Sequence, residues 1–275
     1  MGNLQWDKDF INKVICGDCL EVMKDIPDNS IDMVLTSPPY DNLRTYNGSL
    51  DWGEHIWKPV IKELFRIVKD GGVVVWVVGD ATINGSETGT SFRQALYFKE
   101  VGFNLHDTMI YEKLCYMPLT HKRQEQAFEY MFVFSRGNPK TFNPRLKKNK
   151  EAGKIITGNR RHNGNDLEKI HGVGKQIKEY GQDINIWRYA TGSVCYDGDV
   201  EARKHPAVFP AKLAEDHILS WSNEGDTILD PMAGSGTTLK MAKLNNRNFI
   251  GCEISSEYCD IIKERVGCDI IIPPH

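Results

Sequence analysis

Short, continuous apolar blocks alternate along the chain with longer segments in which apolar residues recur at helical spacing. Blocks that are apolar on both faces are typical of strands inside a parallel sheet. They predict strands at 14–15, 31–36, 73–78, 227–230 and 248–254. Residues 105–113 and 128–137 also have strand character.

Helical periodicity fills the intervals between these blocks. It predicts helices at 19–26, 56–72, 91–103, 237–246 and 257–267, and a further helix before residue 227. Gly71 and Gly72 are predicted to end the second of these helices, and Gly102 the third. Strands that alternate with helices predict an α/β fold built on a doubly wound, mostly parallel sheet.

Residues 137–185 depart from this pattern, because they are rich in Lys, Arg, Asn and Gly and have little apolar periodicity. We therefore predict one α/β domain formed by 1–136 and 186–275, with 137–185 inserted into it. Trp187 and Arg188 stand where order returns, and the sequence leaves open whether they belong to the core.

A glycine-rich turn, in the stretch ILDPMAGSGTT, follows the predicted strand 227–230 and precedes a helix. Open α/β sheets bind ligands at such junctions. Gly234 and Gly236 would let the backbone approach a ligand closely. The turn lacks the third glycine of a dinucleotide fingerprint, since position 239 is Leu239, and it lacks the lysine of a P-loop.

Two carboxylates frame this turn. Asp230 stands just before it and suits an ammonium group, and Glu253 ends the next strand, where an acid can accept hydrogen bonds from a ribose diol. S-adenosylmethionine contains a ribose and an amino group but no phosphate, so it fits this arrangement. A plain tight turn is the alternative for a lone GxG.

A second motif, TSPPY at residues 36–40, ends the predicted strand 31–36. Each proline lacks a backbone N–H and fixes φ, so the corner is rigid. Together with DPMAGSGTT, the motif resembles the (S/N/D)PP(Y/F) signature of the amino-methylating DNA methyltransferases, which act on cytosine N4 or adenine N6. The order of signature, basic middle and cofactor motif is similar to the beta group of that family, and KHPAVFP at 204–210 resembles the segment before the cofactor motif.

The resemblance implies a Rossmann-like, S-adenosylmethionine-dependent methyltransferase with 137–185 as its target-recognition region. The catalytic residues that it implies are Ser37, Pro38, Pro39 and Tyr40. The cofactor-binding residues that it implies are Asp18, Thr36, Phe209, Asp230, Pro231, Met232, Ala233, Gly234, Ser235, Gly236, Thr237, Thr238, Glu253 and Ile254. Asp18 could instead cap a helix, Phe209 could instead belong to the core, and Met232 replaces the usual Phe.

The chemistry of the reaction gives the proline corner a purpose. An exocyclic amine is a poor nucleophile because its lone pair is delocalised into the base. Acceptors on both N–H groups, for which we name the Ser37 hydroxyl and the Pro38 carbonyl, would turn that lone pair toward the methyl group. Tyr40 would stack on the extruded base. Serine before Pro-Pro is commoner among cytosine-N4 enzymes, so N4 is our first choice and adenine N6 the alternative.

The basic middle region contains the predicted contacts to double-stranded DNA. These residues are Arg145, Lys147, Lys148, Lys150, Lys154, Arg160 and Arg161. A charge run is also typical of a solvated loop, but its place in the chain favours phosphate binding. Methylation of RNA or of a protein amide, and a non-catalytic binding module, remain the alternatives.

Composition adds little to this interpretation. The net charge of −3 makes no global case for nucleic acid. No apolar run reaches membrane-spanning length and the chain starts without an export pattern, so we expect a cytoplasmic protein with reduced cysteines and no metal site. Monomer or homodimer, and a paired restriction endonuclease, are left open.

Overall fold

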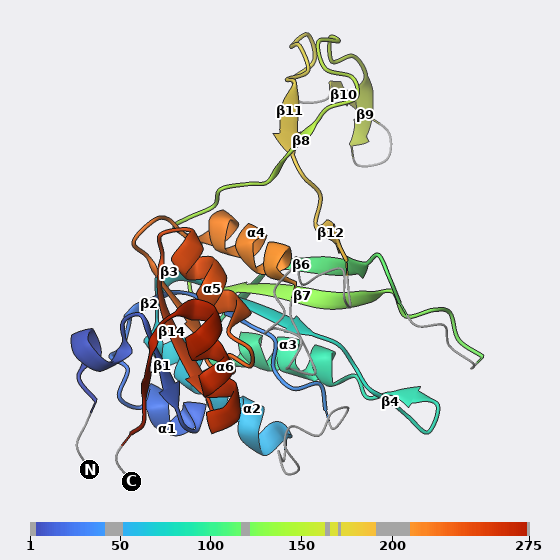
Figure 1. The fold of residues 1–275 in the computed structure, drawn as a ribbon. Coiled ribbons are helices and arrows are strands. Elements are labelled where there is room, and N and C mark those ends of the chain that lie inside the picture. The colour runs from blue at the N-terminus through green and yellow to red at the C-terminus, as the bar shows by residue number, and fades with distance from the viewer. Residues whose placement is uncertain are drawn as a thin grey trace. The chain divides into compact units, whose positions relative to one another are not determined.

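The computed structural model describes residues 4–41, 52–116, 122–162, 166–169, 172–190 and 210–273, with the backbone alone in 159–162 and 166–169 (Figure 1). The chain divides into two compact units. One comprises Met1–Asn143 with Asn185–His275, and the other is Pro144–Ile184.

The first unit is built on a nine-stranded sheet with the order β12-β6-β7-β3-β2-β13-β14-β1-β15. Its strands are β1 Lys13–Cys16, β2 Ile31–Thr36, β3 Val68–Val78, β6 Asn104–Lys113, β7 Phe128–Ser135, β12 Ile186–Tyr189, β13 Thr227–Asp230, β14 Asn248–Glu253 and β15 Asp269–Ile271. Strand β7 runs antiparallel to β3 and β6, and the other neighbours are parallel. This confirms the predicted doubly wound, mostly parallel sheet.

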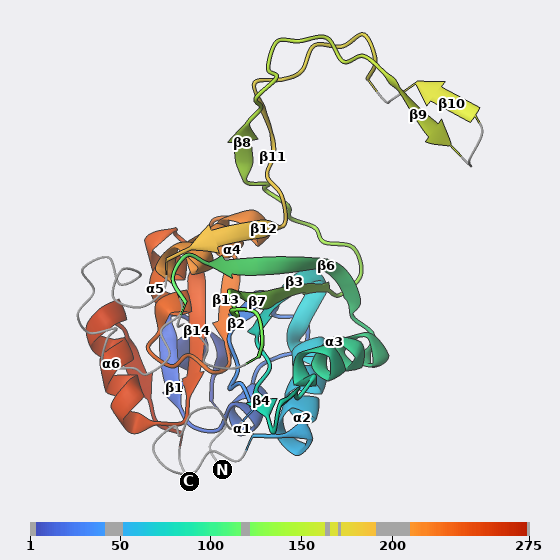
Figure 2. The ribbon, with the colours of Figure 1, turned by 90° about the vertical axis from the view of Figure 1, so that its right-hand side faces the viewer.

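Helices cover both faces of this sheet (Figure 2). They are α1 Cys19–Met23, α2 Glu54–Ile67, α3 Thr90–Val101, α4 Ala211–Trp221, α5 Thr237–Leu244 and α6 Ser256–Val266, and a short π-helix, η1 Trp6–Phe10, precedes them. Alternate residues of β3 serve the two faces. Val74 and Trp76 pack in the apolar cluster that includes α1 to α3, whereas Val73 and Val75 pack in the cluster that includes α4 to α6.

The predicted helix end at Gly71 and Gly72 is wrong. Helix α2 ends at Ile67, and β3 begins at Val68, which pairs with Ile31 of β2. Both glycines lie inside β3, where the register with β2 shifts and Gly71 has a φ of +81°. Glycine is common both at β-bulges and just after helix C-caps, so the local sequence did not distinguish them.

The Pro144–Ile184 unit consists of antiparallel pairs. Strand β8 (Leu146–Lys148) pairs with β11 (Tyr180–Gln182), and β9 (Asn159–His162) pairs with β10 (Asp166–Lys169). None of the side chains described in this unit is buried, so within the described part it has no apolar core. Strand β12, which contains Trp187 and Arg188, belongs to the first unit. Trp187 is buried there, and Arg188 pairs with Glu112 at 2.7 Å.

The helices described here are too short or too polar to cross a membrane.

The close packing around Gly72 gives a test of the bulge. A Cβ at this position would lie 2.9 Å from the carbonyl oxygens of Asp32 and Lys69, which are backbone atoms that cannot turn away. We expect Gly72→Ala to lower the free energy of unfolding by about 2 kcal/mol or more in urea titrations. Gly17→Ala is the matched control, since its Cβ would meet nothing closer than 3.5 Å. Equal stability of the two variants would contradict the described bulge.

Candidate active site

The two sequence motifs meet at one edge of the sheet. Strands β1, β14, β13 and β2 are consecutive, parallel neighbours. From β13 the chain passes through α5 to β14 on one side, and from β2 it passes through α2 to β3 on the other. The β13–β2 pair is therefore a topological switch point, where the carboxyl ends of open α/β sheets bind ligands. The glycine-rich turn follows β13 and the proline corner follows β2.

Asp230 is the last residue of β13 and is buried. Its Oδ1 accepts a 3.1 Å hydrogen bond from the Met232 backbone N–H. The hydroxyls of Thr36 and Thr238 approach the carboxylate and favour its ionised form, although Thr36 does not reach good hydrogen-bond geometry. Burial outweighs these contacts and raises the pKa of Asp230 to about 6. The Thr238 hydroxyl donates its proton to the Leu35 carbonyl of β2 at 3.3 Å, which ties the glycine-rich turn to the strand that ends in the proline corner.

Glu253 closes the glycine-rich turn from β14. Its carboxylate accepts the Gly234 N–H at 2.8 Å and the Ser255 N–H at 2.9 Å. Burial, with a smaller contribution from the nearby Asp230, outweighs the two backbone N–H groups and raises the pKa of Glu253 to about 7. In the turn Gly236 has a φ of +78°, a conformation that favours glycine. Its missing side chain also leaves room for Ile262, which a Cβ would meet at 3.0 Å.

The other predicted residues of the turn share this setting. Pro231, Ala233, Ser235, Thr237 and Thr238 are buried, and Met232 is half-buried against the apolar cluster that includes α1 to α3. Ile254, one residue beyond Glu253, is exposed. Arg265 of α6 holds the outer side of the turn, because its guanidinium donates to the Ser235 carbonyl.

Asp18 follows β1 and lies next to the end of β14, since Cys16 pairs with Glu253. Its Oδ1 accepts the Leu20 N–H at 2.7 Å, so Asp18 is the N-cap of α1. Asp18 thus has the helix-capping role that the sequence offered as the alternative to cofactor binding. Its position at the same edge of the sheet leaves the predicted cofactor contact a proposal.

The proline corner is tied to strands that the sequence analysis did not connect with it. Ser37 Oγ lies 3.0 Å from the Tyr40 hydroxyl, which donates to Glu129 Oε2 of β7 at 2.7 Å. Glu129 Oε1 pairs with the Lys113 ammonium of β6 at 2.6 Å. No local signal marked Glu129 or Lys113, because their relation to Tyr40 arises only when β3, β7 and β6 assemble.

Two further acids near the corner have structural partners. Asp80 follows β3 and accepts bonds from the backbone N–H and the hydroxyl of Ser91, so it helps to fix the start of α3. Asp41 accepts the Ala81 N–H at 3.2 Å and the Thr88 hydroxyl at 2.6 Å. These two contacts fix the Asp41 side chain beside the segment that follows β3.

Several predicted DNA contacts take part in ion pairs within the Pro144–Ile184 unit. Arg145 and Lys147 lie 3.6 and 3.7 Å from Asp183, and Lys148 lies 3.5 Å from Glu179. Lys154 pairs with Glu151 and Lys150 is exposed. Solvent reaches all of these ion pairs, so they are weak and compatible with exchange for phosphate. The side chains of Arg160 and Arg161, and the whole of Phe209, lie outside the described residues.

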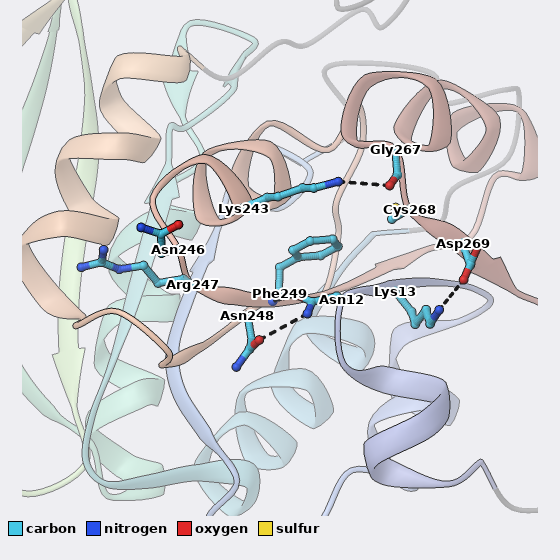
Figure 3. A pocket seen from close by; sticks show the side chains of 10 residues that line it. All are labelled: Asn12, Lys13, Lys243, Asn246, Arg247, Asn248, Phe249, Gly267, Cys268 and Asp269. Atoms are coloured by element: carbon cyan, nitrogen blue, oxygen red, sulfur yellow. Dashed lines mark hydrogen bonds and ion pairs between the residues drawn. The ribbon is translucent and has the colours of Figure 1, made fainter.

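A surface pocket lies elsewhere, at the amino ends of β14, β1 and β15 (Figure 3). Its volume is about 480 Å³. Its charged groups are already engaged, since Lys13 pairs with Asp269 and Lys243 donates to the Val266 carbonyl at 2.7 Å. This pocket is at the opposite ends of the strands from the two motifs.

Comparison with known proteins identifies the family. Residues 31–264 match the family model for N6_N4_Mtase, a DNA methylase. The orphan methyltransferase M.BamHII of Bacillus amyloliquefaciens is 56% identical over 254 residues, which cover 90% of this chain and 93% of that protein. The type II methyltransferase M.BglII of Bacillus subtilis is 28% identical, over 92% of this chain and 68% of that protein.

Solved structures share the fold. The PvuII DNA methyltransferase, which is cytosine-N4-specific, superposes with a TM-score of 0.64 at 20% identity, covering 96% of this chain and 98% of that one. M1.HpyAVI in its SAM complex gives a TM-score of 0.59 at 22% identity, covering 92% and 98%.

The mostly parallel sheet, with the glycine-rich turn and the proline corner at its switch point, is the Rossmann-like fold of the solved DNA methyltransferases. The chain belongs to the N6_N4_Mtase family of DNA methylases. The resemblance to amino-methylating DNA methyltransferases is thereby confirmed, and the family membership leaves cytosine N4 and adenine N6 both open.

The raised pKa values of Asp230 and Glu253 predict the pH dependence of stability. In the unfolded chain such carboxyls titrate near pH 4, so between about pH 4 and 7 the folded protein binds more protons than the unfolded one. This contribution makes the free energy of unfolding fall as the pH rises through that range. The contribution is fully present below about pH 4, where the carboxyls are protonated in both states, and it is lost completely once the pH exceeds the folded-state pKa values.

Asp230→Asn should therefore stabilise the free protein at pH 8 by roughly 1–3 kcal/mol and reduce the pH slope, because it removes a buried charge. Urea titrations at several pH values between 4 and 8 measure both effects. Asp260→Asn, at an exposed position of α6, is the control and should change neither. A wild-type slope that Asp230→Asn leaves intact would contradict the assignment.

Proposed function

We propose that this protein transfers a methyl group from S-adenosylmethionine to an exocyclic amino group of a base flipped out of double-stranded DNA, with cytosine N4 as the preferred target. The observation that carries the proposal is the juxtaposition of the two motifs at the β13–β2 switch point. They are linked there by the Thr238 hydrogen bond to the Leu35 carbonyl.

The chemistry of the turn fits this cofactor. Asp230 and Glu253 are buried carboxylates, and no cationic side chain of the described residues pairs with either. Buried carboxylates that lack a cationic partner favour a ligand that brings a positive charge and hydroxyl donors. The cofactor's ammonium group would lie near Asp230 and its ribose diol near Glu253. Bound S-adenosylmethionine supplies an electrophilic methyl carbon on a sulfonium. The structure of M1.HpyAVI, which shares this fold, is a SAM complex.

The proline corner supplies two acceptors for the target amine. Within the described residues no group donates to the Pro38 carbonyl, although Pro38 is buried. The Ser37 hydroxyl and this carbonyl would hold the two N–H groups and aim the nitrogen lone pair. The amine nitrogen then bonds to the methyl carbon as the carbon–sulfur bond breaks, S-adenosylhomocysteine leaves, and the surplus amine proton passes to water.

The choice of cytosine N4 is supported by Ser37 before Pro-Pro. The PvuII enzyme, whose fold this chain shares, is cytosine-N4-specific. Adenine N6 is the second candidate. A paired restriction endonuclease stays an open prediction, and the 56% identical relative is itself described as an orphan methyltransferase.

Ser37→Ala tests the role of the hydroxyl. We expect kcat to fall about 100-fold, as it does when one preorganised hydrogen-bonding group is lost, with cofactor affinity unchanged. Mass spectrometry of nucleosides from treated DNA measures turnover and names the base. Ser86→Ala, at an exposed position in the short strand β5 (Ser86–Glu87), is the control. N6-methyladenine without N4-methylcytosine would reverse the proposed base, and full turnover by Ser37→Ala would remove Ser37 from the mechanism.

We assign DNA backbone contact to the Pro144–Ile184 unit. Its described side chains are unburied, and Lys147, Lys148 and Lys154 take part in ion pairs that solvent can reach. Phosphate binding by such residues releases counterions, and this makes affinity depend on salt.

A triple variant, Lys148→Gln, Lys150→Gln and Lys154→Gln, tests this assignment. It should weaken duplex binding and reduce the slope of log affinity against log salt by about 0.9 for each phosphate that the protein no longer neutralises. Fluorescence anisotropy at several salt concentrations measures the slope. Replacement of Lys62, Lys99 and Lys263 by Gln removes the same charge from exposed helical positions and should not change it. Equal slopes in the two triple variants would contradict the assignment.

A further inference from the structure

A chain of polar contacts leads from the proline corner into the sheet. Ser37 Oγ lies 3.0 Å from the Tyr40 hydroxyl, which lies 2.7 Å from Glu129 Oε2. Glu129 Oε1 lies 2.6 Å from the Lys113 ammonium. Most of this chain is shielded from water, since the Glu129 and Lys113 side chains are only 17% and 24% exposed. The Tyr40 ring is fixed against Gly79, whose Cβ, if present, would lie 3.6 Å from it.

The direction of each hydrogen bond follows from proton counting. An ionised carboxylate only accepts, so the Tyr40 hydroxyl donates its single proton to Glu129. The Tyr40 oxygen can then only accept from Ser37, so the Ser37 proton points away from the target base. The Ser37 oxygen is left with lone pairs for an incoming N–H.

Without this direction the corner would be ambiguous. A serine hydroxyl rotates freely and can donate as readily as it accepts. A donating hydroxyl would present a proton to the amine and compete for the lone pair that must attack. The Lys113 ammonium occupies Oε1 of Glu129 and leaves Oε2 for Tyr40.

We propose that Glu129 and Lys113 are positioning residues that act through Tyr40 to make the Ser37 hydroxyl a hydrogen-bond acceptor for the target amine. This inference rests on the proposed methyl transfer and adds two residues from β7 and β6 to it.

Glu129→Gln is the sharpest test, because the side chain keeps its shape and changes only its hydrogen-bonding capacity. Lys113 would draw the amide oxygen, so the NH₂ would face Tyr40 and donate to it. The Tyr40 proton would then turn to Ser37 and reverse its role. We expect kcat to fall about 10- to 100-fold, the range for one hydrogen bond to a charged group. The melting temperature and the affinity for S-adenosylmethionine, measured by calorimetry, should not change.

Lys113→Met removes the ion pair with Glu129 but keeps the carboxylate that accepts from Tyr40, so it separates the two effects. Glu129 remains an acceptor toward Tyr40 in this variant, so kcat should fall by less than about threefold, the effect of losing one modest ion pair. In the double variant Glu129→Gln and Lys113→Met the amide can turn its oxygen toward Tyr40. Its kcat should therefore exceed that of Glu129→Gln alone. A double variant no more active than Glu129→Gln would overturn the part assigned to Lys113.

Tyr40→Phe tests the route, because it keeps the ring and removes the hydroxyl. In this background Glu129→Gln should cause no further loss, and an additive loss would show that Glu129 acts by another path. Glu112→Gln is the matched control, since Glu112 is a half-buried strand glutamate paired with Arg188, and it should keep full activity.

The outcomes separate this inference from the proposed function. Wild-type protein that methylates no DNA would contradict the proposed function. An active wild type whose kcat Glu129→Gln leaves unchanged would overturn the positioning role alone.

Discussion

The pairing of β2 with β13 is the constraint on which the site depends. Met33 and Val34 lie opposite Ile228 and Leu229, so segments from opposite ends of the chain become neighbours in one sheet. Side chains reinforce this seam, because Asp32 accepts both the Thr227 N–H at 3.0 Å and the Lys69 ammonium at 2.7 Å. A parallel pair fixes where its two strands end. The proline corner and the glycine-rich turn therefore follow neighbouring strand ends. This proximity does not depend on the conformation of the residues between them in the sequence.

Two carboxyl groups buried near the β2–β13 pair lower the stability of the fold, as is typical of a binding site. Two acids, Asp230 and Glu253, are buried beside it with backbone N–H groups and hydroxyls as their partners. Their raised pKa values show that these neighbours only partly replace water. A sequence chosen only for stability would place neutral side chains there. A ligand that brings a positive charge and hydroxyl donors offsets the unfavourable burial of such carboxylates. The same residues that destabilise the free protein therefore strengthen the binding of such a ligand.

The sequence predicted what depends on local pattern and missed what depends on assembly. Motifs at strand ends were visible because the apolar blocks located the strands, and the family model agrees with that interpretation. Gly71 was misassigned because a left-handed glycine is common both at a bulge and at a helix end. The sequence did not predict the short antiparallel strands in Pro144–Ile184. Strands are recognised by alternating buried and exposed positions, and the described residues of this unit have no buried face. For Asp18 the sequence offered two roles, and the structure shows the cap without testing the other.

The direction of β7 explains why Glu129 was missed. Ligand sites in α/β sheets are sought where parallel strands end, and the TSPPY and DPMAGSGTT motifs follow such ends. Strand β7 runs the other way, since Val78 of β3 pairs with Tyr130, so its first residues lie at the ligand edge. Glu129 therefore reaches the site from the start of a strand, beside Gly79. The antiparallel strand brings to the catalytic edge an acid that no connecting loop carries. Its backbone is held on both sides by β3 and β6, so it can direct a hydroxyl more rigidly than a loop residue could.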